Sequence, residues 1–282
     1  MAGTLYIVGT PIGNLEDVTM RALRVLREVD LIAAEDTRRT ARLLQHYSIA
    51  TPATSLHEHN ERGKAPHLIA RLQAGASIAL VSDAGMPLVS DPGAWLVTAA
   101  REAGIPIQVV PGPSAVTAAL AGAGMSGPFG FLGFPPSSGR PRKDWMRRLA
   151  EMGGLTVVFF EAPHRMAKTL GELHTLLGDR PIMVAKELTK VHESLVEQPI
   201  STWLDAPEGP ALDRGEFVVI VPPWLDVGDN RAEPPGGEAV LHEMGDMTNR
   251  QGMKPRAAAK ALAAKYRLSA DDIYELHSKR EK

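Results

Sequence analysis

Short apolar runs alternate with segments of helical periodicity over the first 125 residues. The runs are continuously apolar rather than alternating, which is typical of strands in a parallel sheet covered by helices on both faces. The predicted strands lie at residues 5–9, 31–36, 53–58, 77–83 and 105–112. This pattern predicts an α/β domain over residues 1–124.

Helices are predicted between these strands, where apolar residues recur every three or four positions. Thr37 is expected to cap the second helix, and Pro113 to occupy the first position of the last one. Gly75 is expected to close the third helix. The predicted helices lie at about residues 18–29, 37–47, 67–75, 93–104 and 113–124.

The pattern changes after residue 125, where strands outnumber helices. The predicted strands lie at residues 129–134, 156–163, 181–188, 192–200 and 216–223, with only two or three helices between them. This ratio predicts a mixed sheet with hairpins, and hence a second α/β domain over residues 125–223. A proline-rich linker at 224–237 is expected to lead into a helical basic segment at 238–282.

Charge is distributed unevenly along the chain. The formal net charge of the 282 residues is −2, which argues against a globally basic nucleic-acid binder. However, residues 139–148 hold five basic side chains and one acid, and residues 250–282 hold nine basic and four acidic ones. Two basic patches on one chain favour an anionic polymer as partner.

Composition excludes several other classes of protein. The chain has no cysteine, so disulfides and thiolate chemistry are excluded. The amino terminus shows no signal peptide, and no apolar run approaches the length of a membrane span. A cytoplasmic protein with no membrane partner is expected.

Three glycine-containing turns follow predicted strands of the first domain. Gly9 and Gly13 lie in VGTPIG, SDAGMPLVSDPG spans residues 82–93, and Gly112 lies in VPGPSA. Ligands of open parallel sheets bind at the carboxyl ends of the strands, where these turns are expected to meet. The helix that starts near Ser114 would present free N–H groups to an anion such as a carboxylate. The three turns therefore predict a crevice for a small molecule.

Other motifs leave alternatives open. Glu35 and Asp36 end the second strand about twenty residues after the first turn, where a Rossmann domain holds a ribose, so a nicotinamide cofactor is an available interpretation. His57 and His59 are two residues apart, but no third ligand is implied and no metal is predicted. The H-E-x-x-H and G-x-S-x-G motifs of zinc proteases and serine hydrolases are absent from the sequence.

Seven motifs together resemble the tetrapyrrole methylase superfamily, and most closely its ribosomal RNA branch. They are, in order, GTPIGNL, AEDTR, SDAGMPLVSDPG, PGPSA, FFEAPHR, ELTK and GEFVVIV. The resemblance covers about Leu5 to Pro222. It implies a two-domain α/β fold, usually dimeric, with S-adenosylmethionine in the cleft between the domains. The implied activity is 2′-O-methylation of a cytidine in the 16S rRNA of the small ribosomal subunit.

The resemblance also implies which residues bind the cofactor. Those in the first domain are Pro11, Gly13, Ser82, Asp83, Ala84, Met86, Leu88, Gly112 and Ser114. Those in the second domain, expected to close over the adenine and the methionine, are Phe160, Glu161, Ala162, Leu188, Gly215, Glu216 and Phe217.

The general base and the RNA contacts follow from the chemistry that the reaction needs. A ribose hydroxyl is a poor nucleophile, so a positioned base is expected to help. The candidates are Asp36, with Glu35 behind it, and Lys190 or Glu187 across the cleft, and the sequence does not rank them. The predicted RNA contacts are Arg38, Arg39, His57, His59, Arg140, Arg142 and Lys143.

Two other functions remain open from the sequence. A methyltransferase acting on a corrin or sirohaem precursor would share the fold and the cofactor and differ in the acceptor. A nucleic-acid-binding regulator would use the helical tail to read DNA, but more than two hundred residues would then serve a ligand crevice without an evident role.

Overall fold

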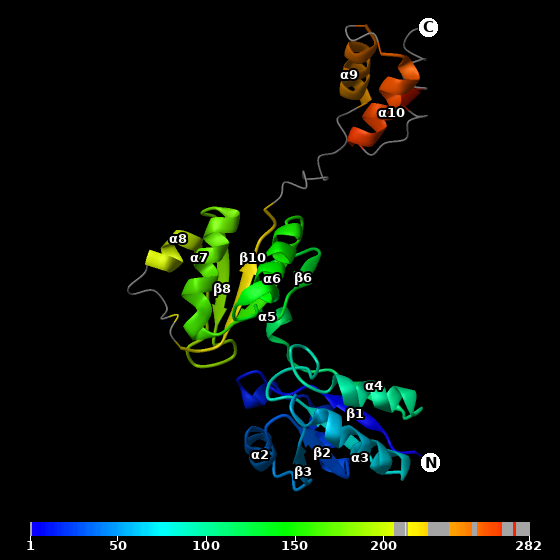
Figure 1. Cartoon of the computed structure of the whole chain (residues 1–282), viewed down its shortest axis with the longest axis vertical. Helices are drawn as coiled ribbons and strands as arrows, with labels where there is room; N and C mark the ends of the chain where they lie inside the picture. Colours follow the sequence, from blue (N-terminus) through cyan, green and yellow to red (C-terminus); the bar gives the residue numbers. More distant parts are fainter. Residues whose placement is uncertain are drawn as a thin grey trace. The chain divides into compact units, whose positions relative to one another are not determined.

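The computed structural model divides the chain into two compact units, Met1–Trp224 and Leu225–Lys282 (Figure 1). It describes residues 2–205, 212, 214–224, 237–249, 253–266 and 273–274. Among these residues, none of the helices combines the length and the apolarity needed to cross a membrane.

The first unit contains a parallel sheet whose strands are ordered β3-β2-β4-β1-β5. Its strands are β1 (Leu5–Val8), β2 (Leu31–Ala34), β3 (Ala53–Ser55), β4 (Ile78–Val81) and β5 (Ile107–Val110). Every neighbouring pair is parallel, as the apolar runs predict. Because β1 lies between β4 and β5, the turns that follow these three strands are neighbours at one edge of the sheet.

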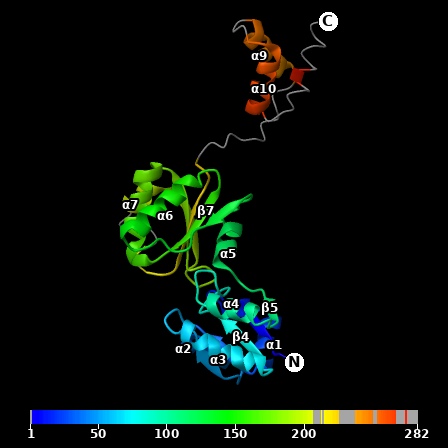
Figure 2. The same ribbon diagram turned by 45° about the vertical axis from the view of Figure 1, so that its right-hand side comes forward.

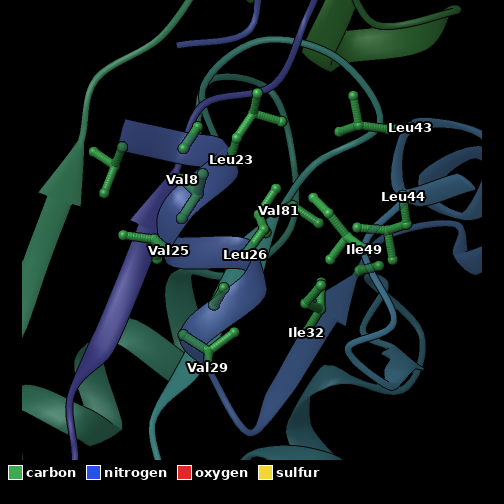
Figure 3. Close-up of a cluster of buried hydrophobic side chains, with 14 residues drawn as sticks. Val8, Leu23, Val25, Leu26, Val29, Ile32, Leu43, Leu44, Ile49 and Val81 are labelled. Carbon is green, nitrogen blue, oxygen red and sulfur yellow. The ribbon is translucent and has the colours of Figure 1, made fainter. Parts of the chain in front are cut away.

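Helices cover both faces of this sheet. One face carries α1 (Met20–Glu28) and α2 (Thr37–His46), and the other carries α3 (Glu61–Gln73) and α4 (Ala94–Glu102). Figure 3 shows the core of the first face, where Leu23 and Leu26 of α1 lie among side chains of the strands and of α2. The short helix η1 (Leu15–Asp17) lies in the turn after β1.

The ends of three helices differ from the sequence predictions. Asp36 rather than Thr37 is the N-cap of α2, because its carboxylate accepts a hydrogen bond from the backbone N–H of Arg38 (2.8 Å). Helix α3 begins at Glu61 and contains Pro66, since burial of its apolar face outweighs the helix-breaking tendency of proline. Pro113 precedes the N-cap of α5 (Ala115–Gly122) and is not a helical residue.

The second sheet is mixed, as predicted, with the order β6-β7-β10-β8-β9. Its strands are β6 (Phe129–Phe131), β7 (Thr156–Glu161), β8 (Pro181–Lys186), β9 (Ser194–Pro199) and β10 (Phe217–Val221). Strands β6 and β7 pair in parallel, while the other pairs are antiparallel and β8–β9 forms a hairpin. The predicted two-sheet α/β fold is thus confirmed.

Helices also cover both faces of the second sheet. Helices α6 (Gly139–Glu151), α7 (Met166–Leu177) and α8 (Ile200–Asp205) pack on one face, and η2 (Pro163–Arg165) leads into α7. Helix α5 lies on the other face (Figure 2). Its Val116 and Leu120 pack against Val158 and Ile220. The predicted boundary after residue 124 assigns α5 to the first domain, whereas its apolar face packs on the second sheet.

The second unit contains α9 (Gly237–Asn249) and α10 (Pro255–Tyr266). Val240 and Met244 of α9 pack with Ala258, Leu262 and Ile273 in a small core of its own. Both helices lie in the segment predicted to be helical, while most of the predicted linker lies outside the described residues.

Candidate active site

A cleft of about 410 Å³ lies in the first unit, between the carboxyl edge of the first sheet and the second sheet. Its volume falls within the range of about 300–1,000 Å³ that is usual for small-molecule sites. The first sheet contributes the turns after β1, β2, β4 and β5, and the second contributes the ends of β7 and β10 together with Leu188. Both sheets therefore form its walls.

The three glycine-containing turns meet at this edge, as the sequence predicts. The backbones of Thr10 and Gly85 exchange hydrogen bonds of 2.9 and 3.1 Å, and the Thr10 hydroxyl donates to the carbonyl of Ser82 (3.2 Å). A Cβ atom on Gly9 would lie 2.7 Å from the Cα atom of Gly112. The close approach of the turns thus requires that neither glycine carry a side chain.

Two loops beside the cleft hold unfavourable backbone conformations. Leu88 and Ser90 have φ of 72° and 70° in the loop after β4, and Glu187 and Thr189 have φ of 52° and 67° in the loop after β8. Each non-glycine residue in this region costs roughly 1–2 kcal/mol. Such conformations are held by the surrounding structure and are typical of functional sites.

Asp36 is committed to its own helix. Besides capping α2, its carboxylate pairs with the Arg38 guanidinium at 2.7 Å. The hydrogen bond from the Arg38 side chain holds the pKa of Asp36 far below its usual range. A carboxylate with so low a pKa is a weak base, which argues against its predicted catalytic role.

We expect Asp36→Asn to leave the activity that the resemblance implies, methyl transfer, within a few-fold of wild type. Asparagine is also a good N-cap, and the carboxylate is not needed as a base. Asp36→Ala should lower the unfolding temperature by no more than a few degrees through loss of the cap. Thermal unfolding and a transfer assay on both variants test this. A folded, cofactor-binding Asp36→Asn protein without transfer activity would restore Asp36 as the base.

Glu35 faces the cleft and interlocks with Asp83. Its carboxylate accepts a hydrogen bond from the backbone N–H of Asp83 (3.2 Å), while Asp83 accepts one from the backbone N–H of Asp36 (3.0 Å). Burial raises the pKa of Glu35, and the negative charge of Asp83 adds to this effect. The pair joins the ends of β2 and β4.

Lys190 and Glu187 neutralise each other. The Lys190 ammonium lies 3.0 Å from Glu187 and 2.9 Å from Glu216. Burial opposes the charge of Lys190, but the hydrogen bonds to Glu216 and Glu187 outweigh it and raise the pKa of the ammonium. Burial likewise opposes the charge of Glu187, yet the hydrogen bond from Lys190 helps to lower its pKa. The Lys190 ammonium has no lone pair with which to accept a proton, and the lowered pKa of Glu187 makes its carboxylate a weak base.

Most of the predicted cofactor-binding residues lie at the cleft or beside it. Those in its walls are Asp83, Ala84, Met86, Ser114, Phe160, Glu161, Ala162, Leu188, Gly215, Glu216 and Phe217. Pro11, Gly13 and Ser82 line an adjoining hollow of about 380 Å³, together with Arg39 and Lys190. Gly112 does not line the cleft, but its backbone packs directly against that of Gly9. Leu88 directly precedes the wall residue Val89.

Sequence reasoning missed several wall residues, of which Asp91 is the most notable. Burial raises its pKa to about 7, and the negative charge of Glu35 contributes. Its signal was the second aspartate of SDAGMPLVSDPG, which also fits ordinary turn chemistry. Phe134 was also missed as a wall residue, because the sequence assigned it to a strand. Strand β6 instead ends at Phe131. The centre of the Phe134 ring lies 5.3 Å from the centre of the Phe160 ring, and both residues line the cleft.

The predicted RNA contacts fall into two groups. Arg38 and Arg39 are exposed near the cleft, where Arg39 also lies 3.5 Å from Asp83. His57 and His59 line a separate hollow of about 400 Å³ next to the cleft. In the part of the chain that the structure describes, no cluster of three His, Asp or Glu side chains could hold a metal ion.

Arg142 is a correction to the predicted RNA contacts, whereas its neighbours Arg140 and Lys143 are exposed. The Arg142 side chain is only 5% exposed, and its guanidinium donates to Glu172, Thr169 and the carbonyl of Pro136, each at 2.8 Å. The burial of Arg142 was not evident from the basic run, because the sequence does not show which basic position of this amphipathic helix faces inward. Arg142 is therefore bound within the second sheet's helical layer and is not available to a phosphate.

The model of the family Tetrapyrrole (Corrin/Porphyrin) Methylases matches residues 4–203 of the chain. The chain belongs to this family. The Vibrio cholerae protein named Ribosomal RNA small subunit methyltransferase I is 41% identical over 279 residues, which cover 97% of this chain and 94% of that protein. The protein of the same name from Synechocystis is 51% identical over 177 residues, covering 62% of this chain and 63% of its own length.

Solved structures confirm the fold. Uroporphyrin-III-C-methyltransferase from Thermus thermophilus superposes with a TM-score of 0.55 at 21% identity, covering 77% of this chain and 94% of the other. Diphthine synthase superposes with a TM-score of 0.60 at 15% identity, and the match covers 78% of this chain and 90% of the other. At these identities the likeness concerns the fold alone.

Proposed function

We propose that the protein transfers a methyl group from S-adenosylmethionine to the ribose 2′-oxygen of a cytidine in 16S rRNA of the small ribosomal subunit. Position 1402 of that RNA is what the resemblance implies for this cytidine. The observation that carries the proposal is the 41% identity to the Vibrio cholerae relative, which extends over 97% of this chain and so includes its basic helical end. A homodimer in the cytoplasm is part of the proposal.

The walls of the cleft suit the two ends of S-adenosylmethionine. The rings of Phe134, Phe160 and Phe217 offer apolar surface to an adenine. Glu35 and Asp83 supply carboxylate groups that suit a cationic sulfur and an ammonium group. The N–H groups that begin α5, behind Ser114, suit a carboxylate.

When bound, S-adenosylmethionine supplies an electrophilic methyl group on a positively charged sulfur. The protein's own residues then have to hold the acceptor hydroxyl in line with that group and exclude water. Positioning of this kind accounts for as much as about 7–11 kcal/mol of a barrier. The strained loops at Leu88, Ser90, Glu187 and Thr189 are consistent with such rigid positioning.

The distribution of charge favours RNA as the acceptor. Helix α6 exposes four basic side chains, Arg140, Lys143, Arg147 and Arg148. Two of them, Arg140 and Arg147, lie within 4 Å of the carboxylate of Asp144. The segment 250–282 adds nine basic side chains against four acidic ones. Such patches bind phosphate backbones, and binding through them weakens as salt rises.

An acceptor panel tests the proposal. The full-length protein would be incubated with labelled S-adenosylmethionine and, separately, unmodified small subunits, protein-free 16S rRNA and a uroporphyrin-type tetrapyrrole. We expect label in the RNA of the small subunits and none in the tetrapyrrole. Label confined to the tetrapyrrole would contradict the RNA acceptor, and the absence of cofactor binding by calorimetry would contradict the proposal as a whole.

A further inference from the structure

A second hollow shares a wall with the cofactor cleft. It measures about 400 Å³ and is lined by residues of the β3–α3 loop, His57, Glu58 and His59, and by Pro92. The wall common to both spaces consists of Glu35, Ser90 and Asp91. A group on this wall can therefore face a ligand in either space.

The loop that carries Asp91 is anchored at both ends. Ser90, directly before it, has a φ of 70°, and Gly93, two residues after it, has a φ of 124°. Buried Glu61 then accepts hydrogen bonds from the first N–H groups of α4, Trp95 (2.7 Å) and Leu96 (3.2 Å). The position of Asp91 is thus fixed by backbone conformation and by the start of a helix.

The second hollow also contains an unsatisfied polar atom. The His57 Nε2 atom lies 2.9 Å from the Asn60 side-chain nitrogen, which has hydrogens to donate and therefore makes Nε2 the acceptor. The ring proton then belongs on Nδ1, which is buried and has no hydrogen-bond partner in the described structure. A buried donor without a partner is costly, and this one belongs to a residue that lines the second hollow.

We propose that the second hollow receives the acceptor nucleoside and that Asp91 is the catalytic base for its ribose 2′-hydroxyl. This inference rests on the proposed function. The ribose O2′ forms a bond to the methyl carbon as the bond from that carbon to sulfur breaks, and its electron pair stays on sulfur. The hydroxyl proton passes to a carboxylate oxygen of Asp91.

The other acidic and basic groups near the wall are less suited to this role. Asp36 is held by Arg38, Glu35 already accepts the Asp83 N–H, and Lys190 and Glu187 are paired with each other. The raised pKa of Asp91, about 7, lies close to neutral pH, where a general base works best. Several charged or titratable groups line the two spaces beside it. They are Glu35 from the turn after β2, Asp83 from the loop after β4, Arg39 from α2, His57, Glu58 and His59 from the β3–α3 loop, Glu161 from β7, and Glu216 from the turn before β10.

The test compares Asp91→Asn with a matched control, Glu102→Gln, which changes an exposed acid at the far end of α4. Asp91→Asn should lower kcat for small-subunit methylation by roughly 10²–10⁴-fold. Its affinity for S-adenosylmethionine, measured by calorimetry, should stay within a few-fold of wild type. Glu102→Gln should match wild type in both measurements.

The pH profile separates a base from a merely structural residue. In wild type, kcat/KM should rise with pH and level off above about 7, because the ionised carboxylate is the active form. Glu35→Gln removes a neighbouring negative charge, so it should shift the midpoint to lower pH. Asp91→Glu should restore part of the activity that Asp91→Asn loses.

Three results would overturn the inference. One is an Asp91→Asn protein with near wild-type kcat, and another is a pH midpoint that Glu35→Gln leaves in place. The third is an Asp91→Asn protein that has lost cofactor affinity or its fold, with Asp91→Glu equally inactive, which would make the residue structural. If wild type itself methylates no ribose, the proposed function fails and this inference falls with it.

Discussion

Replacing Gly112 by valine is expected to abolish S-adenosylmethionine binding. A Cβ atom at this position would lie 2.8 Å from the Cα atom of Gly9, and a backbone atom cannot rotate away. The turn after β5 would have to move away from the turn after β1, whereas binding sites tolerate displacements of only about 0.5 Å. Calorimetry should show at least a hundred-fold loss of affinity, and Gly112→Ala a smaller loss in the same direction.

Gly63→Ala is the matched control for this experiment. Gly63 is an exposed residue of helix α3, and a Cβ atom there would have no neighbour within 4 Å. Alanine should therefore stabilise the protein by about 0.5–1 kcal/mol through helix propensity and leave cofactor affinity unchanged. Wild-type affinity in a folded Gly112→Val protein would contradict the role of the three turns.

Glu161→Ala is expected to produce the largest loss of stability. The Glu161 side chain is fully buried at the end of β7, where it accepts hydrogen bonds from the N–H of Ala162 (2.8 Å), from Arg165 (2.7 Å) and from the Thr169 hydroxyl. Removing one partner of a buried ion pair costs about 3–5 kcal/mol, because the remaining charge is left uncompensated. For a protein of this size, each kcal/mol lowers Tm by roughly 2–4 °C.

Thermal unfolding of Glu161→Ala beside Glu151→Ala tests this expectation. Glu151 is an exposed residue at the end of α6, and its replacement should change stability by less than about 0.5 kcal/mol. Glu161→Ala should also weaken cofactor binding, since Glu161 and Ala162 belong to the cleft wall. Equal Tm values for the two variants would show that the buried pair does not stabilise the fold.

The central strands of both sheets could be predicted from the sequence because they are buried on two faces and therefore continuously apolar. β4 is fully buried, and the apolar run before SDAGMPLVSDPG predicts it directly. Helix starts were less predictable, because they depend on side-chain contacts rather than on periodicity. Helix α3 begins before Pro66 since its apolar residues reach the core, and Asp36 caps α2 by a bond that Thr37 could equally have made.

The convergence of the three turns was predictable from a general property of parallel sheets, but the chemical state of individual side chains was not. Sequence alone does not show that Lys190 lies 3.0 Å from Glu187, or that Arg142 is surrounded by Glu172 and Thr169. Asp91 was missed for a related reason. Its raised pKa depends on burial and on the charge of Glu35, which is 56 positions away in the sequence and adjacent only after folding.

The most direct test of the central claim is to identify the nucleoside that receives the methyl group. Small subunits would be methylated by the wild-type protein, their RNA digested to nucleosides, and the products separated by mass spectrometry. We predict a single new product, 2′-O-methylcytidine, which is absent when Asp91→Asn replaces wild type. A methyl group on a base, or no methylated nucleoside from a protein that binds S-adenosylmethionine, would contradict the claim.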